Sequence, residues 1–275
     1  MKKEHRIRMI FFEVEAGLCN RLRGLVSAYY FAQEAQQPLT IIWEQDINCN
    51  CKFASLFSLH IDEPIQIWEV NCMGSRLQDK IMHRYNRYKK STIKRKCRNV
   101  HIGDLRELEI KQLKEEAQAG DLYLKSNSCW YEVPHAFSIL SLKPDIQKKV
   151  NKLVNACGEN RVGVHIRRTD HEICIENSPT EAFIRAMNKE PMDTCFYVAT
   201  DDEQELRKII NVFGNEKIVY NAKAELSRGT EQGMEDATID LFVLSGMKKI
   251  LGSDGSSFTD IAGMIGEIPV VRCHI

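Results

Sequence analysis

The second half of the chain alternates short apolar runs with stretches of helical periodicity, and this alternation limits the possible folds more than any other feature. Strands are expected at 162–166, 195–199, 217–220, 250–251 and 270–271. Helices are expected at 144–157, 179–189, 202–213, 236–247 and 258–265. Parallel strands need crossover connections of this kind. The pattern therefore predicts a doubly wound, parallel α/β sheet.

The first half begins in the same way. Residues 7–14 fit a buried strand, 22–36 have apolar residues at helical spacing, and 39–43 fit a second strand. Further elements are expected at 55–59, 65–70, 104–117 and 122–125. We therefore expect two α/β domains, an N-terminal one over 1–140 and a C-terminal one over 141–275, with the boundary just before Pro144.

Composition excludes several classes of protein. The 275 residues contain 38 Lys plus Arg and 38 Asp plus Glu, so no global field attracts nucleic acid, and an anion site has to be local. No hydrophobic leader follows Met1, and no apolar run approaches the roughly 18 residues of a membrane span. These features predict a soluble, cytoplasmic protein and leave peripheral membrane association open.

The cysteines predict neither disulfides nor a metal centre. The chain has 10 of them, scattered and mostly in apolar surroundings, as small buried hydrophobic residues are. Cys49 and Cys51 form one C-x-C pair with His60 downstream, but a second ligand pair at zinc-site spacing is missing. We therefore expect no bound metal.

Polar clusters follow three of the predicted strands in the second half. They are His165, Arg167, Arg168 and Asp170; Thr200, Asp201 and Asp202; and Ser253, Asp254, Ser256 and Ser257. The carboxyl ends of parallel strands share one edge, where open α/β sheets bind ligands. Arginine binds two phosphate oxygens at once through its guanidinium N–H groups. Serine hydroxyls and the first N–H groups of a helix can donate to the remaining phosphate oxygens. The sequence thus predicts a site for a nucleotide diphosphate.

Simpler structural roles are open for most of these residues. One of Asp201 and Asp202 is needed as a helix N-cap, and Asp170 could pair with an arginine. His165 could be a hydrogen-bonded core histidine, and Ser256 with Ser257 could be a cap. A purely structural role is harder to give to Arg167 and Arg168. Neighbouring strand residues point to opposite faces, so at least one of the two arginines should lean towards the sheet edge.

Two features of the first half also suggest binding. The turn from Gly17 to Asn20 lies between a strand and a helix, where N–H groups could meet a ligand, although Asn20 could simply be an N-cap. The basic segment 80–98 contains Tyr85 and Tyr88 between its charges. Such a segment could bind RNA or a lipid headgroup, but is more often a solvated excursion, that is, a charged segment that leaves the packed fold and is exposed to solvent.

Several classes of nucleotide-binding protein and hydrolase are excluded because their glycine motifs do not occur in this sequence. No G-x-G-x-x-G follows either buried strand, and no G-x-x-x-x-G-K-[ST] occurs, which argues against dinucleotide oxidoreductases and P-loop NTPases. A G-x-S-x-G nucleophile elbow is also missing.

Three motifs together resemble a known superfamily. VGVHIRRTD at 162–170, FYVATDD at 196–202 and the block 240–263, from DLFVLSGMKKILGS to SSFTDIAG, resemble in order the three regions of the α-1,6-fucosyltransferase and protein O-fucosyltransferase superfamily. GLCNRLRGLVSAYYFA at 17–32 is similar to the N-terminal region of bacterial nodulation fucosyltransferases. The middle, about 45–140, shows no such similarity.

The resemblance implies a GT-B fold, in which two Rossmann-like domains with parallel sheets face each other across a cleft. The N-terminal domain would serve the acceptor and the C-terminal domain the GDP-sugar. The implied reaction is inverting transfer of fucose from GDP-fucose to a glycan hydroxyl, without a divalent metal or other cofactor. The implied partners are a nucleotide sugar and a glycan, with no nucleic acid.

The resemblance also assigns roles to residues. Arg167 would contact the diphosphate and stabilise the leaving GDP, and Asp201 would hold the guanine. The expected substrate-binding set is completed by Arg168, His165 near the guanosine, Asp170, Ser256 and Ser257 at the phosphates, Phe258, Gly17 and Asn20.

The catalytic base is less well defined by the motifs. The first motif departs from close relatives at His171, where they have lysine, and the downstream glutamate is shifted by about one residue. Glu176 is the first candidate for the base and Glu172 the second. A protein that binds a GDP-sugar without transferring it, and a transferase using another GDP-sugar, both stay open.

Overall fold

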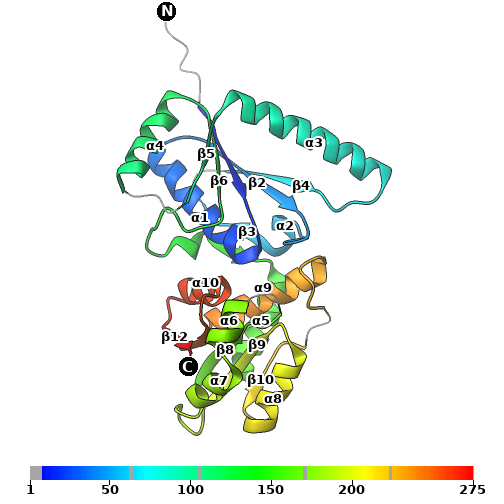
Figure 1. The fold of residues 1–275 in the computed structure, drawn as a ribbon, viewed down its shortest axis with the longest axis vertical. Coiled ribbons are helices and arrows are strands. Elements are labelled where there is room, and N and C mark those ends of the chain that lie inside the picture. The colour runs from blue at the N-terminus through cyan, green and yellow to red at the C-terminus, as the bar shows by residue number, and fades with distance from the viewer. Residues whose placement is uncertain (1–7, 62–64, 104–106, 170–171, 223–224, 275) are drawn as a thin grey trace, which may run out of the picture. The chain divides into compact units, whose positions relative to one another are not determined.

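The computed structural model describes residues 8–61, 65–103, 107–169, 172–222 and 225–274. The chain divides into two compact units (Figure 1). The N-terminal unit is Met1–Ser141 with Arg228–Glu231, and the C-terminal unit is Leu142–Ser227 with Gln232–Ile275. The expected domains differ from these units mainly in the segment 228–231. The roles expected of the two domains stay predictions.

The N-terminal unit is built on a parallel sheet with strand order β4-β2-β1-β6-β5. Its strands are β1 (Ile10–Val14), β2 (Leu39–Gln45), β4 (Gln66–Asn71), β5 (Arg98–His101) and β6 (Leu122–Ser126). Its helices are α1 (Leu18–Ala35), α2 (Phe53–Leu56), α3 (Leu77–Lys96), α4 (Glu107–Ala119) and the 3₁₀ helix η1 (Ala136–Ile139). A separate pair of strands joins β3 (Phe57–Leu59) to β7 (Leu140–Leu142).

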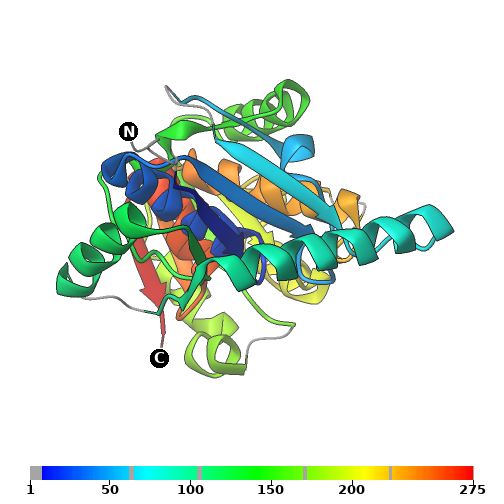
Figure 2. The ribbon, with the colours of Figure 1, turned by 90° about the horizontal axis from the view of Figure 1, so that it is seen from above.

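Alternation along β1 divides the two faces of this sheet. Phe12 is fully buried and lies against Gly24 of α1, which is therefore on one face. Phe11 packs on the other face with Trp68 and Ile93 of α3. Glu13 also points to this face and pairs with α3 rather than with solvent. Figure 2 shows α3 lying across the strands, with its N-terminal end extending beyond the sheet.

Segment 80–98 is mostly exposed, as a solvated segment would be, but most of it belongs to helix α3, which packs on the sheet. Twenty residues form a continuous helix that connects β4 at one edge of the sheet to β5 at the other. The sequence hides this helix because its sheet-facing side is largely ionic: Lys90 Nζ lies 3.0 Å from Glu13 Oε1 and 2.5 Å from Glu44 Oε1. Lys94 adds a third ion pair, 3.0 Å from Glu13 Oε2. A helix that packs on a sheet is normally predicted from an apolar stripe on its inner side, and the sequence of α3 lacks this stripe.

The C-terminal unit has a second five-stranded parallel sheet, with order β10-β9-β8-β11-β12, which confirms the predicted α/β fold class. Its strands are β8 (Arg161–Ile166), β9 (Cys195–Thr200), β10 (Ile218–Val219), β11 (Ile250–Ser253) and β12 (Val270–Cys273). Its helices are α5 (Pro144–Ala156), α6 (Glu172–Asn177), α7 (Thr180–Met187), α8 (Glu203–Phe213), α9 (Glu231–Ser245) and α10 (Ser257–Gly266). Strand β8 is central, with β9 and β11 on either side.

The segment after β8 differs from the prediction in two ways. The residues between the predicted strand 162–166 and the predicted helix 179–189, where a loop is expected, contain the short helix α6. Ser178 directly precedes the helix predicted at 179–189, so its sequence position predicts an N-cap. It is instead fully buried and accepts a hydrogen bond from Asp254 N over 2.8 Å, while Pro179 occupies the N-cap position of α7. Ser178 therefore joins the loop after β11 to the segment after β8.

Helices that could cross a membrane are absent from the described part of the chain, since none is both long and apolar enough.

Candidate functional site

Arg167 stands at the carboxyl edge of the C-terminal sheet, immediately after β8. Its backbone N–H donates to Ser253 Oγ at the end of β11 over 2.9 Å, and its Nη1 lies 2.7 Å from Asp201 Oδ2 after β9. Three strand ends thus meet at one edge, as the parallel topology requires. The Arg167 side chain is 20% exposed, so the protein does not enclose it completely.

Asp201 organises the start of the loop after β8. Its carboxylate accepts hydrogen bonds from Arg168 N and from Thr169 Oγ1, each over 2.8 Å. Burial raises the pKa of Asp201, but the charge of Arg167 and these hydrogen bonds outweigh it and hold the pKa below its usual value. The ionised carboxylate therefore fixes the orientation of Arg167.

The sequence left open whether Asp201 or Asp202 caps the helix that follows, and the structure gives this role to Asp202. Asp202 is the N-cap of α8 and accepts a hydrogen bond from Gln204 N over 2.7 Å. Asp201 is therefore not needed as a cap. Asp170, another expected site residue, lies outside the described residues.

Arg168 points to a different set of partners. Its Nη2 lies 3.2 Å from Glu205 Oε2, an oxygen that also accepts from Thr180 Oγ1 over 2.6 Å. Its guanidinium carbon lies 5.8 Å from the ring centre of Phe183. The side chain is only 10% exposed and ties β8 to α7 and α8. Contact between Arg168 and a donor stays a prediction.

The start of α10 lies against the same strand. His165 is buried on β8, with Nδ1 2.7 Å from Thr259 Oγ1, and its ring stacks on Phe258 with centroids 4.8 Å apart. Ser256 is buried at the N-cap position, where its side chain makes no capping hydrogen bond, and Ser257 begins the helix. The first N–H groups of a helix favour an anion. The expected roles of these residues toward GDP stay predictions.

Glu176 lies in α6 and is exposed. It lines a hollow of about 430 Å³ together with Asn177, Asp254, Arg272 and His274. Asn177 Nδ2 donates to Asp254 Oδ2 over 3.3 Å, which ties α6 to the residue that follows β11. Glu176 is therefore at the same edge of the sheet as Arg167. Glu172, the second candidate for the base, lies one turn earlier in α6.

The predicted turn of the N-terminal unit has a different cap from the expected one. Gly17 is the N-cap of α1, and Asn20 lies inside the helix, so the interpretation of Asn20 as N-cap is wrong. The φ of Gly17 is −76°, an ordinary value, and a Cβ there would meet its nearest neighbours only at 3.9 Å. Asn20 Oδ1 is buried without a hydrogen-bond partner among the described residues. Ligand contacts of this turn stay a prediction.

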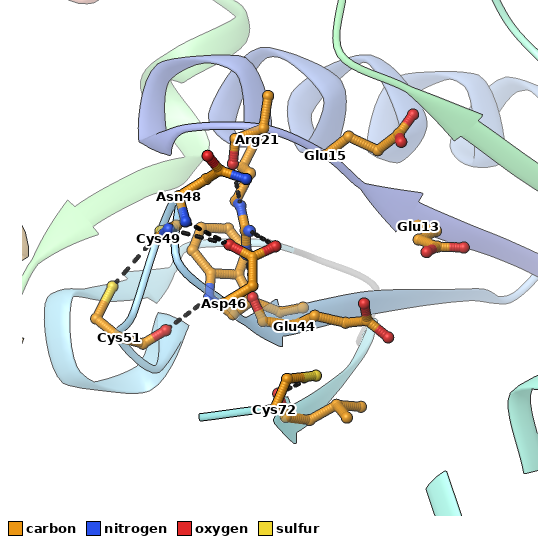
Figure 3. Close-up of polar contacts among 12 residues, drawn as sticks. Glu13, Glu15, Arg21, Glu44, Asp46, Asn48, Cys49, Cys51 and Cys72 are labelled. Atoms are coloured by element: carbon orange, nitrogen blue, oxygen red, sulfur yellow. Dashed lines mark hydrogen bonds and ion pairs between the residues drawn. The ribbon is translucent and has the colours of Figure 1, made fainter. Parts of the chain in front are cut away.

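Sequence reasoning missed Arg21, which is fully buried at the start of α1 (Figure 3). Its Nη2 lies 2.9 Å from Asp46 Oδ2, its Nε donates to Ala16 O over 2.7 Å, and its Nη1 donates to Glu44 O. Its guanidinium carbon lies 5.3 Å from the ring centre of Trp43. The available signal was its helical spacing, because Arg21 continues the stripe of buried residues further along α1.

The C-x-C pair packs beside this arginine. Cys49 Sγ and Cys51 Sγ lie 3.8 Å apart, and both residues are buried. The hydrogen bond between them lowers the pKa of Cys49 and raises that of Cys51. Within the described ranges, no group of three or more His, Cys, Asp or Glu residues could hold a metal ion.

Comparison with known proteins gives a clear result only at the level of structure. No protein-family model matches the sequence, and no curated protein matches it significantly. Among solved structures, fucosyltransferase NodZ from Bradyrhizobium is 17% identical, with a TM-score of 0.61 and coverage of 97% of this chain and 96% of NodZ. The chain has the fold of a fucosyltransferase.

Two further structures support this fold. A mutant of Arabidopsis thaliana FUT1 in complex with GDP is 10% identical, with a TM-score of 0.63, and the match covers 99% of this chain and 71% of FUT1. POFUT1 in complex with GDP-fucose is 11% identical, with a TM-score of 0.57, and the match covers 98% of this chain and 99% of POFUT1. The predicted resemblance to the fucosyltransferase superfamily thus holds for the fold of both units.

Proposed function

We propose that this protein transfers fucose from GDP-fucose to a hydroxyl group of a glycan, with inversion at the anomeric carbon and without a divalent metal. The observation that carries the proposal is Arg167, an accessible arginine held at the end of the central strand by Ser253 and Asp201. The fucosyltransferase fold adds support, since the solved relatives include complexes with GDP and with GDP-fucose.

The reaction needs a group that stabilises the departing diphosphate. The acceptor oxygen forms a bond to the anomeric carbon of fucose while the bond from that carbon to the β-phosphate oxygen breaks, and the bonding electrons stay on GDP. Arg167 and the N–H groups at the start of α10 supply fixed positive charge where this negative charge develops. Such groups perform the role that a divalent cation has in other transferases.

The acceptor hydroxyl also has to lose a proton. Glu176 is exposed and lines the hollow beside Asp254, so a substrate hydroxyl can approach it. We assign Glu176 as the general base that accepts the proton of the acceptor hydroxyl. The glycan acceptor and a cytoplasmic location belong to the same proposal and rest on the sequence.

A transfer assay tests the proposed reaction. The protein is incubated with EDTA, a panel of oligosaccharides and either GDP-fucose or GDP-mannose, and GDP release and the anomeric configuration of the product are measured. We expect acceptor-dependent GDP release with GDP-fucose and an inverted linkage. Equal transfer from GDP-mannose would refute the donor assignment, and GDP-fucose binding without transfer to any acceptor would favour a binding protein.

A further inference from the structure

Helix α3 exposes most of its apolar residues and directs two of its lysines towards its own sheet. The side that faces the sheet carries Lys90 and Lys94, which pair with Glu13 and Glu44. Asn86 is also buried on this side. Amphipathic helices of globular proteins normally bury their apolar stripe and expose their charges. Ile93 of α3 packs against the sheet, but the exposed apolar residues of this helix need another explanation.

The solvent-facing side of α3 carries these apolar residues. Leu77, Ile81, Tyr85 and Tyr88 are 74%, 61%, 58% and 66% exposed. Their spacing of four, four and three residues places them on one face of the helix. Met82, also on the first turns, is 56% exposed. We call the set Leu77, Ile81, Tyr85 and Tyr88 the outer stripe.

Exposed cations lie along both sides of the outer stripe. At 100° per residue, Lys80, Arg84 and Arg87 fall on one flank, and Lys89, whose Nζ lies 4.3 Å from the ring centre of Trp68, falls on the other. Asp79 is the only acidic residue of the helix, against eight Lys and Arg. The whole chain has no net charge, so this concentration of positive charge is local.

The shape of α3 suits a flat partner. Its 20 residues correspond to a rod of roughly 30 Å. The N-terminal end, which carries Leu77 and Ile81, extends beyond the edge of its own sheet (Figure 2). The outer stripe is therefore presented along a line instead of being enclosed in a pocket.

We propose that α3 lies in the interface of an anionic phospholipid membrane, with the outer stripe among the acyl chains and the flanking cations at the lipid phosphates. An apolar stripe between cations is the pattern of helices that lie in the plane of a membrane surface. Positive charge on α3 complements anionic headgroups, and each lysine or arginine near such a surface strengthens binding.

Two other partners fit the surface less well. A second copy of the chain would bring the flanking cations of two α3 helices close together, which opposes stripe-to-stripe contact. RNA is bound by cations with aromatic rings on which bases stack. Half of the outer stripe, Leu77 and Ile81, is aliphatic and offers no such ring.

Vesicle co-sedimentation tests the proposal. Probes are vesicles of phosphatidylcholine alone and of phosphatidylcholine mixed with phosphatidylglycerol. We expect the full-length protein to bind the mixed vesicles much more tightly than the neutral ones, and to lose affinity as salt rises. Equal binding to both vesicles, or binding to neither, would overturn the proposal, as would binding of single-stranded polyuridine in place of vesicles.

Matched variants separate the two parts of the surface. Lys80→Ala with Arg84→Ala should weaken binding about fivefold for each charge removed. Ile81→Ser with Tyr88→Ser should reduce it by at least tenfold. The controls Lys148→Ala with Lys152→Ala on α5, and Met192→Ser, change exposed residues elsewhere and should have no effect.

Circular dichroism shows whether each variant keeps its helix content. Since all these side chains are exposed, the fold should be unchanged. Full vesicle binding by the well-folded Ile81→Ser/Tyr88→Ser variant would contradict insertion of the outer stripe. A shift from dimer to monomer in that variant, by light scattering, would instead assign the stripe to self-association.

Discussion

Arg167 Nη1 and Asp201 Oδ2 lie 2.7 Å apart at the carboxyl edge of the C-terminal sheet. The pair joins the ends of two neighbouring strands, β8 and β9, and Asp201 also accepts hydrogen bonds from Arg168 N and Thr169 Oγ1. Arg167 is therefore preorganised before any ligand arrives. Preorganised charge is effective in catalysis because it needs no rearrangement when the transition state forms.

The first prediction concerns Arg167. Arg167→Ala should reduce the rate of fucose transfer on the order of a hundredfold or more, because it removes charge that stabilises the leaving diphosphate. Steady-state kinetics with GDP-fucose measure the loss. Arg185→Ala, an exposed arginine on α7, is the control and should keep the normal rate. Near-normal turnover in Arg167→Ala would reject the assignment.

The second prediction distinguishes the two neighbouring arginines. Arg168→Ala removes the buried cation beside Glu205, which is 4% exposed, but leaves Lys208 Nζ 2.5 Å from Glu205 Oε1, and should lower the free energy of unfolding by about 2 kcal/mol. Arg167→Ala removes a more exposed side chain and should lower it by only about 1 kcal/mol. Urea denaturation monitored by fluorescence gives both values. A loss in Arg167→Ala as large as the one expected for Arg168→Ala would mean that both arginines are structural.

The third prediction concerns the base. Glu176→Gln should reduce kcat by about a hundredfold while the affinity for GDP stays unchanged, because the carboxylate acts on the acceptor proton and not on the donor. Glu172→Gln, one turn away in the same helix, is the matched control. If Glu172→Gln is the slower variant, the two glutamates exchange roles.

The fourth prediction concerns acid stability of the N-terminal unit. Burial raises the pKa of Glu13, but Tyr123, Lys90 and Lys94 together lower it to about 2, from 4.5. A carboxyl group with a lowered folded-state pKa stabilises the fold above its unfolded pKa, and this contribution disappears as the pH falls through the folded value.

The shift predicts a loss of about 3 kcal/mol of stability between pH 4.5 and pH 2. Chemical denaturation at a series of pH values measures it. Glu13→Gln should be less stable than wild type at pH 7 and should lose much less on acidification. An identical pH profile in wild type and Glu13→Gln would show that Glu13 is not the responsible group.

The sequence predicts the C-terminal unit well because its structure follows from local patterns. An apolar run that stops at Arg167 predicts β8 and places the arginine at a sheet edge. The helix α3 depends on distant partners instead: Lys90 pairs with Glu13, 77 residues earlier. The charges of Lys90 and Lys94 therefore suggested a solvent-facing position until the sheet that these two lysines face was known.

The contacts of the candidate site could not be predicted from the sequence because they join residues that are distant in the chain. Asp201 could be selected as a site residue from its position after a strand, but its bond to Arg167 requires the order of β8 and β9. Ser178 looked like a helix cap because the following sequence suits one. Its true partner, Asp254 N, lies 76 residues away. Local sequence carries no information on such a contact.

The most direct test of the donor site is calorimetric titration of wild-type protein and Arg167→Ala with GDP and GDP-fucose in the presence of EDTA. We predict micromolar binding of both ligands to wild type, and binding at least tenfold weaker to Arg167→Ala. Failure of wild type to bind either ligand, or equal binding by the two proteins, would contradict a GDP-fucose site at Arg167.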